Sequence, residues 1–269
     1  MAVFRSFTYD GIKSLDKGVY ITGQAVYNAP ERDIELVAIP GRNGDLAIDQ
    51  GRYNNIEVSY PAGMYGPDQP DFAERLREFR NLLTARYTYL RLTDEYHPDE
   101  FRLALYKSGL DVSPAAYHQA GEFTITFECK PQRFLTSGEV PVDVYKHEYL
   151  TDHNLDPITD HNGNPIDLNA MSGEVVNPTP YECKPLIIAP SAGAVTMGNI
   201  GIEIAGDGSK DVYIDCDSME IYTMEGEAMV SAADLVTFTP NRFPVMPPGE
   251  NTFSSTIPDI QIIPRWWIL

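Results

Sequence analysis

The sequence predicts a mainly β protein made of two parts, with α+β character confined to the N-terminal part. Among its 269 residues are 16 Tyr and 11 Phe, side chains that suit the half-buried face of a β-sheet. Gly and Pro number 20 and 21, which supplies many turns between short apolar runs. The hydrophobic content of 43% is enough to form one large core or two ordinary ones.

Charge is distributed unevenly along the chain. The formal net charge is −19, and residues 1–135 hold 15 basic against 19 acidic side chains, whereas residues 136–269 hold 5 against 20. Pro131 and Gly138 mark a boundary between these halves, so we expect an N-terminal domain over 1–135 and a C-terminal domain over 136–269. An acidic surface repels phosphate, which argues against ordinary nucleic-acid binding and against anionic membranes.

No targeting or membrane-spanning segment is recognisable. The start, MAVFRSF, lacks the basic-then-apolar plan of a secretory signal, and no apolar run reaches about 18 residues. We therefore expect a protein made and kept soluble in a cytoplasm. Its cysteines are odd in number and form no C-x-x-C pair, which predicts buried free thiols in place of disulfides or a zinc site. They are Cys129, Cys183 and Cys216.

The first domain is expected to begin with strands and a projecting hairpin. Residues 18–27 and 33–39 are β-rich runs bounded by turn residues. Glycines between short apolar runs in 40–61 predict a hairpin arm over about 33–60. A hairpin with few large apolar residues near its tip cannot bury itself, so it is suited to lie on another surface, and a solvated hairpin is the open alternative. The candidate assembly residues at the tip are Pro40, Gly41, Arg42, Asn43 and Gly44.

One helix is predicted, over about residues 71–86. Asp71 and Glu74 form a pair that resembles a capping box close to Pro70. Apolar residues recur at helical spacing and would pack on a sheet. They are Phe72, Leu76, Phe79 and Leu83. Three runs with alternating apolar residues are predicted strands after the helix, at 87–94, 101–112 and 121–131.

The second domain has the pattern of a β-sandwich. From Tyr181 onward, short apolar runs recur at fairly regular spacing with turn residues between them. These runs are KPLIIAPS, GIEIA, DVYIDCDSMEIYT, LVTFTP, NTFSST and IQIIPRWWIL. We therefore expect two packed layers of short strands in this half.

A polar loop at about 146–172 precedes the sandwich pattern. It contains the tandem octapeptides TDHNLDPI and TDHNGNPI, which begin at Thr151 and Thr159. Asp160, Asn162 and Asn164 faintly resemble the first positions of a calcium loop. Because the Gly and the closing Glu of such a loop are missing, a plain surface loop is favoured over a metal site.

Signatures of catalysis are not recognisable. The sequence holds no G-x-S-x-G, no H-E-x-x-H, no P-loop and no dinucleotide glycine fingerprint. Its five His lie in polar or turn-like settings, where a solvated side chain is the ordinary case. We therefore predict no catalytic residue, no cofactor and no bound metal, and expect that the protein is not an enzyme.

Five strings, in order, extend along nearly the whole chain. They are IPGRNGDLAIDQGRYNN at 39–55, FECKPQRF at 127–134, VVNPTPYECKPLI at 175–187, VYIDCDSMEIY at 212–222, and RFPVMPPGENTF at 242–253 followed by the terminal IIPRWW. Each alone is an ordinary turn or strand signal. Together they resemble one family, the distal tail protein of long-tailed, non-contractile bacteriophages, also called the phage tail component family.

The resemblance implies an architecture and a role. The N-terminal domain would close into a hexameric ring around a channel, with the hairpin arm embracing the neighbouring subunit, and the C-terminal domain would be a galectin-like β-sandwich. The ring would join the tail tube to the tail-tip or baseplate proteins. Implied partners are the chain itself as a homohexamer, the major tail tube protein, and a tail-tip or tail-associated protein. Tape measure protein and receptor-binding protein are further candidates, with DNA only in transit and no membrane. The implied location is the virion, at the phage tail tip, after assembly in the host cytoplasm.

Two readings from other classes stay open. A carbohydrate-binding module in the second domain could aid host adsorption through Trp266 and Trp267, but adjacent strand residues face opposite ways and make no common platform. One of the two is expected in the core and the other at a surface or interface. A hydrolase acting on cell-wall polymers would need a metal or paired-carboxylate constellation, and none is recognisable in the sequence.

Overall fold

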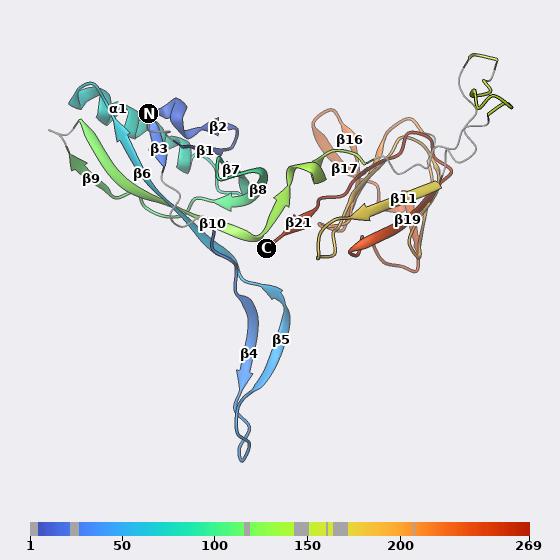
Figure 1. The fold of residues 1–269 in the computed structure, drawn as a ribbon, viewed down its shortest axis with the longest axis horizontal. Helices are drawn as coiled ribbons and strands as arrows, with labels where there is room; N and C mark the ends of the chain where they lie inside the picture. The colour runs from blue at the N-terminus through green and yellow to red at the C-terminus, as the bar shows by residue number, and fades with distance from the viewer. Residues whose placement is uncertain are drawn as a thin grey trace. The chain divides into compact units, whose positions relative to one another are not determined.

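The computed structural model describes residues 5–21, 27–115, 119–142, 151–159, 161–163, 172–206 and 208–269. Figure 1 shows a fold dominated by strands, with one α-helix among the described residues. The predicted mainly β class is therefore confirmed. The chain forms two units, Met1–Phe134 with Leu269, and Leu135–Ile268.

A single large sheet organises the N-terminal unit. Its strands follow the order β2-β1-β7-β8-β10-β6-β3, and β9 also pairs with β10. The bounds are β1 Phe7–Tyr9, β2 Ile12–Lys13, β3 Val19–Ile21, β6 Ile56–Tyr65, β7 Leu90–Asp94, β8 His97–Leu105, β9 Val112–Ala115 and β10 Ala120–Leu135. A 3-10 helix, η1 (Ser14–Lys17), precedes β3.

The core of this unit lies on one face of β6 and β10. These strands pair antiparallel without a break from Tyr65 opposite Ala120 to Ile56 opposite Cys129. Since side chains alternate between faces, every second residue of the paired segments Ile56–Tyr65 and Ala120–Cys129 is buried. Aromatic rings dominate the buried face: Phe7 stacks on Tyr60 at 5.4 Å, and Phe127 meets Phe7 edge-on at 5.5 Å. Such ring pairs add about 0.5–1.5 kcal/mol beyond the area that they bury.

Helix α1 (Gln69–Thr84) covers this aromatic face. Phe72, Phe79 and Leu83 of the predicted apolar stripe are buried, and Phe79 lies 6.2 Å from the ring of Phe123 on β10. The helix begins two residues before the predicted start, because its N-cap is Asp68 and not Asp71. The carboxylate of Asp68 accepts a hydrogen bond from the backbone N–H of Asp71 at 2.9 Å, and Pro70 occupies the first turn, where its missing N–H is not needed.

The described residues of the C-terminal unit form two five-stranded sheets. One has the order β11-β19-β13-β14-β18 and the other β17-β16-β15-β12-β20. Their bounds are β11 Ser172–Asn177, β12 Leu186–Ala189, β13 Gly193–Met197, β14 Ile200–Ile204, β15 Val212–Asp215, β16 Glu220–Glu225, β17 Ala228–Ser231, β18 Val236–Thr239, β19 Gly249–Ser255 and β20 Gln261–Ile263. The short segments η3 (Thr136–Glu139), η4 (Ala233–Leu235) and β21 (Trp267–Ile268) complete the unit.

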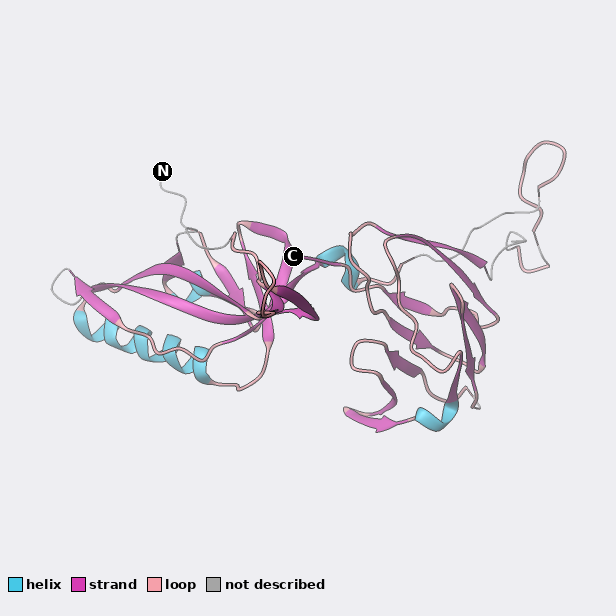
Figure 2. Ribbon diagram, turned by 90° about the horizontal axis from the view of Figure 1, so that it is seen from below, coloured by secondary structure: helices cyan, strands magenta, loops and turns pink. Residues whose placement is uncertain are grey.

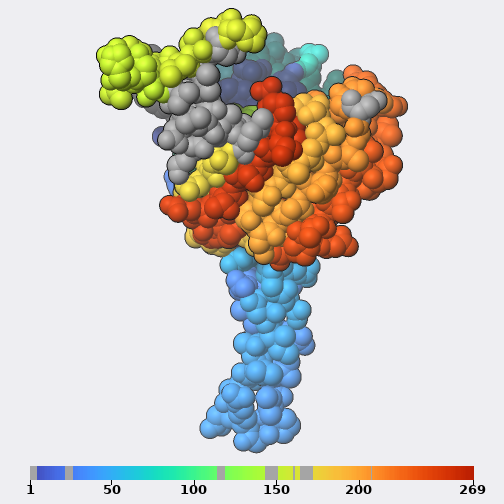
Figure 3. Space-filling model, turned by 90° about the vertical axis from the view of Figure 1, so that its right-hand side faces the viewer, coloured from blue at the N-terminus to red at the C-terminus, as the bar shows by residue number. Residues whose placement is uncertain are grey.

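Both sheets bury one face against a common core. Alternate residues of β12, β14 and β15 are buried, and they join Phe253 and Trp266 in one cluster. In Figure 3 the strands of the first sheet lie side by side as yellow, red and orange bands that present their outer face. The arrangement is that of a β-sandwich.

The three cysteines are buried free thiols, as predicted. Burial raises the pKa of Cys129 and of Cys216 to about 12. A thiol is nucleophilic as its thiolate, so these side chains behave as small apolar core residues.

Candidate assembly site

The predicted hairpin is present as a separate two-stranded sheet. Strand β4 (Arg32–Val37) pairs antiparallel with β5 (Leu46–Tyr53) and with no other described strand. Figure 1 shows the pair leaving the sheet of its own unit, and Figure 3 shows it in blue as a slender limb. We call residues 32–53 the arm. It is shorter than the predicted 33–60, because Ile56–Tyr65 is strand β6 of the large sheet.

The tip of the arm is a tight turn formed by the predicted residues. The backbone N–H of Arg42 donates to the carbonyl of Ile39 at 3.1 Å, with Pro40 and Gly41 in the two central positions. Gly41 has φ of 79°, so the turn has the Pro-Gly pattern of type II, which requires a positive φ at its third residue. Gly44, at φ of 80°, returns the chain toward β5. All five predicted residues, Pro40, Gly41, Arg42, Asn43 and Gly44, are exposed.

Hydrogen bonds close the root of the arm. The backbone N–H of Asn54 donates to the carbonyl of Glu31 at 2.8 Å, which joins the two chains where they leave the arm. Next to this closure, the side-chain amide of Asn55 donates to the hydroxyl of Tyr89 at 2.8 Å. The arm therefore starts from a defined position on the N-terminal unit.

Ion pairs cross the half of the arm nearest its root. The guanidinium of Arg32 donates to Asp49 through Nε at 2.9 Å and through Nη2 at 2.5 Å, and Nε of Arg52 lies 2.7 Å from Asp33. The hydrogen bonds from Arg32 lower the pKa of the Asp49 carboxyl. Exposed pairs of this kind add little to stability, so their main effect is to hold the register of the two strands.

Large aliphatic side chains lie exposed on both faces of the arm. Residues directly opposite one another share a face, so Ile34 and Leu36 point to one side while Leu46 and Ile48 point to the other. Their exposed fractions run from 41% to 65%. A two-stranded sheet has no core in which to bury such residues. The arm is therefore a surface that another molecule can cover, and covering it removes apolar area from water.

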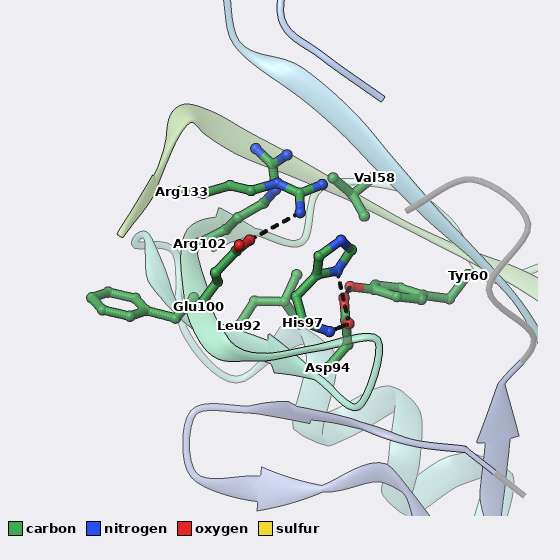
Figure 4. Close-up of a pocket in the computed structure, with 9 residues that line it drawn as sticks. Val58, Tyr60, Leu92, Asp94, His97, Glu100, Arg102 and Arg133 are labelled. Carbon is green, nitrogen blue, oxygen red and sulfur yellow. Dashed lines mark hydrogen bonds and ion pairs between the residues drawn. The ribbon is translucent and has the colours of Figure 1, made fainter. Parts of the chain in front are cut away.

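A polar cluster, drawn in Figure 4, lies beside the segment that leads into the arm. The ring of Tyr27 packs edge-on against His97 at 5.0 Å, and Arg102 reaches the carbonyl of Asn28 at 3.5 Å. In the same cluster the hydroxyl of Tyr60 donates to Asp94 at 2.8 Å, and Arg133 pairs with Glu100 at 3.1 Å. Burial and the neighbouring Asp94 carboxylate raise the pKa of Tyr60.

This cluster has the geometry of a structural contact. The other oxygen of Asp94 accepts from the backbone N–H groups of Tyr96 and His97 at 2.9 and 3.0 Å, so it stabilises the turn between β7 and β8. The cavity that these side chains line has a volume of about 10 Å³. That is room for roughly one water molecule, which is too small for a substrate.

The octapeptide tandem is described in part. In its first copy the carboxylate of Asp152 accepts from the backbone N–H groups of Asn154 and Asp156 at 2.8 and 3.1 Å, which makes a tight polar turn. Asp160 and Asn164 of the calcium hypothesis lie outside the described residues. Within the described part of the chain, no group of three or more His, Cys, Asp or Glu could hold a metal ion.

The N-terminal unit, which carries the arm, is similar in sequence to a known protein family. Residues 19–129 match the family model of the phage tail protein RIFT-related domain. That stretch contains the arm, its root and α1. Most of the N-terminal unit therefore matches a domain found in phage tail proteins.

Solved structures extend the likeness to the full chain. The crystal structure of Dit (gp 19.1) of phage SPP1 matches at a TM-score of 0.66 with 15% identity, and the match covers 100% of both chains. Chains of the phage p2 baseplate, in its activated conformation with Sr and with Ca, match at a TM-score of 0.56 with 8% and 9% identity over 97% of both chains. A comparison with curated proteins gave no match.

These matches confirm the resemblance to the distal tail protein family that the sequence strings indicated. The family model covers residues 19–129, and the solved structures, at 8–15% identity, show a shared fold. Among the described helices, none is long and apolar enough to cross a membrane.

The sequence located the tip of the arm but missed its two apolar faces. The sequence pattern places Ile34, Leu36, Leu46 and Ile48 in strands and does not indicate that they are exposed. Strict alternation of apolar and polar residues predicts a strand with one buried face. In DIELV and DLAID apolar residues fall on both faces of the strand, so the pattern does not indicate which face is covered. The signal that could have found them is the pairing register, which depends on the turn at the tip.

Proposed function

We propose that this chain is a structural phage tail protein that closes into a hexameric ring and joins the tail tube to the tail-tip or baseplate proteins. The arm is the observation that carries the proposal: it leaves its own unit and exposes large aliphatic residues on both faces. The match to SPP1 Dit, described as a paradigm of the hub adsorption apparatus in Gram-positive infecting phages, supports it over the whole chain length.

The assembly mechanism is a heterologous contact. The arm of one subunit lies on a different surface of the next, and the repeated rotation closes the ring. Covering a half-exposed Ile or Leu contributes roughly 1 kcal/mol, so the four aliphatic residues of one arm contribute a few kcal/mol to each subunit contact. Closure multiplies this gain because every subunit both gives and receives an arm.

Charge is distributed in a way that suits such a ring. The near-neutral first half allows close subunit contact, while the acidic second half suits a solvated exterior. On the face of β6 and β10 that points away from α1 lie Glu57 and Glu122, together with Glu128, whose carboxylate is paired with the Lys107 ammonium at 2.7 Å. If this face lines the channel, DNA in transit meets carboxylates that repel its phosphates, and it slides without sticking.

The carbohydrate-binding alternative gains no support from the tryptophans. Trp266 is buried in the sandwich core, and Trp267 stacks on Tyr181 at 4.3 Å while its Nε1–H donates to the carbonyl of Glu182 at 2.9 Å. The two indole rings therefore form no shared platform, as their adjacency predicts. The non-enzymatic role follows from the same proposal, because assembly requires no reactive group.

Mass in solution tests the proposal. Native mass spectrometry of the purified full chain should detect a species of six 30.0 kDa copies, about 180 kDa. An armless variant, in which Asn-Gly replaces residues 32–53 between the hydrogen-bonded Glu31 and Asn54, should be monomeric with an unchanged circular dichroism melting curve. Hexamers of the armless variant would contradict the role given to the arm.

A further inference from the structure

Strand β17 leaves one edge of its sheet open. Among the described strands it pairs with β16 alone, and all four of its residues are exposed. Figure 2 shows it at the rim of the C-terminal unit, where it leads directly into η4. Edge strands of soluble proteins usually carry Lys, Pro or a bulge that blocks pairing with another chain. The sequence of β17, AMVS, contains none of these.

The hairpin that β17 forms with β16 determines which backbone groups face the open edge. Glu225 lies opposite Ala228, and a two-residue loop joins them in which Gly226 has φ of 63°, as the first central position of a type II′ turn requires. The pair that closes such a loop is hydrogen-bonded, and bonded pairs alternate along the ladder. The N–H and C=O groups of Met229 and Ser231 therefore point away from β16.

Apolar side chains on both sides of this edge are uncovered. On the outer face Met229, 60% exposed, lies opposite Met224. On the inner face Val230 lies opposite the buried Thr223 and faces the space between the two sheets, yet it keeps 38% of its surface exposed. A core-facing valine stays this exposed because, among the strands that the structure describes, none lies beyond β17.

A cavity opens beside the inner face of the same edge. Its volume is about 280 Å³, and Val212, Thr223, Val230, Ala232 and Leu235 are among the residues that line it. The Lys210 ammonium and the Glu225 carboxylate, 2.5 Å apart, form part of its rim. Polar residues line it as well, among them Ser191, Ser231 and Asp234. The apolar part of its wall, around Val212, Val230 and Leu235, accepts an apolar side chain more readily than a charged one.

Charge selects the class of partner. Glu227 lies immediately before the strand and Asp234 three residues after its end, in a half of the chain with 5 basic against 20 acidic residues. Two copies of this edge would bring like charges together, whereas a basic segment would be attracted. We propose that β17 is a docking edge for an extended, basic segment of another protein, which adds as a strand beside Met229 and Ser231 and places an apolar side chain in the cavity.

Selection of peptides tests this edge directly. Random twelve-residue peptides displayed on phage are selected on the immobilised full chain, and the most enriched sequence is synthesised with a fluorescein label. Enriched peptides should alternate Val, Ile, Thr or Tyr with other residues and carry Lys or Arg. Fluorescence anisotropy should give a dissociation constant that rises with added NaCl, because exposed charges are screened. Amide exchange measured by NMR should slow at Met229 and Ser231 when the peptide binds.

Two substitutions at one residue separate edge pairing from general effects. Met229→Pro removes an outward N–H without removing a bond to β16, and Met229→Lys places a charge beside the basic peptide. Each should weaken binding at least tenfold, while Met219→Lys, at another exposed Met of the same unit, should leave it unchanged. Circular dichroism confirms that each variant is folded. Failure to enrich any peptide, binding that survives Met229→Pro, or self-association through this edge would overturn the proposal.

Discussion

The contact between Asp215 and Arg265 fixes the end of β15 to the C-terminal segment. Two nitrogens of the guanidinium donate to the two carboxylate oxygens at 2.7 and 2.8 Å, and the backbone N–H groups of Asp217 and Ser218 donate to the same carboxylate at 2.9 and 3.2 Å. Burial alone would raise the pKa of Asp215, but these donors outweigh it and lower the pKa. The carboxylate is therefore stabilised in its charged form.

Replacing this carboxylate should produce a loss of stability that depends on pH. The pKa of Asp215 is lower in the folded than in the unfolded state, so its contribution is present above the unfolded value of about 3.9 and is lost as pH falls through the folded value. Asp215→Asn should reduce the free energy of unfolding by roughly 2 kcal/mol at pH 7. Urea unfolding at pH 7 and near pH 2.5 checks this. A difference from wild type that does not shrink in acid would contradict the assignment.

Gly138 shows a residue choice imposed by close packing. A Cβ at this position would lie 2.3 Å from the backbone nitrogen of Trp266, and the carbonyl of Gly138 accepts from the N–H of Arg265 at 2.8 Å. Because the obstacle is backbone, Gly138→Ala should destabilise the protein by roughly 1–3 kcal/mol. Gly201→Ala is the matched control, since its Cβ would meet the nearest atom at 3.7 Å. Equal melting temperatures for the two variants would contradict this reading.

At the scale of elements, the arm should respond to a change in polarity without loss of fold. Leu36 is exposed and contacts no core, so Leu36→Asp should leave the melting temperature within a degree or two and yet weaken assembly. Leu155→Asp, at an exposed Leu in the first octapeptide, is the matched control and should assemble normally. Light scattering across a concentration series checks both. Assembly that Leu36→Asp leaves intact would show that this face of the arm stays uncovered.

The elements that the sequence predicts best are those in which large apolar side chains recur at a regular spacing. Phe72 and Phe79 recur at helical spacing, and both are buried beneath α1. The N-cap was misplaced because Asp68 and Asp71 are both good capping residues on either side of Pro70, and only the hydrogen bond decides between them. Strands β11, β13 and β17 were missed because SGEVVN, GAVTM and AMVS are short and contain Gly or Ser.

For the candidate site, the sequence predicts where the tip of the arm lies, but it does not predict which apolar side chains of the arm are exposed. Turn chemistry alone placed Pro40 and Gly41 at the tip, since type II geometry needs those residue types. Whether Leu36 and Ile48 face a core or solvent depends on what lies beyond the hairpin, which is a property of tertiary structure. The open edge at β17 likewise depends on sheet order, and no local pattern encodes that.

At the scale of the whole molecule, both units expose surfaces that other proteins can contact. The N-terminal unit exposes aliphatic residues on a limb, and the C-terminal unit combines an acidic surface with an open strand edge. The hydrogen bonds of the cluster around Asp94 are made within the cluster, and the cavity that it lines has room for about one water molecule. The features that face outward are those suited to assembly.

Site-specific cross-linking tests the contact between arm and neighbour most directly. A photoreactive p-benzoyl-phenylalanine at position 36 is placed in one tagged copy, which is mixed with an equal amount of a differently tagged wild-type copy and irradiated. We predict covalent dimers that carry both tags, with the cross-link mapped by mass spectrometry to the N-terminal unit of the partner copy, and none from the same photoreactive residue at position 155. Cross-links that form only within one chain, or equally from both positions, would contradict the claim that the arm holds a second copy.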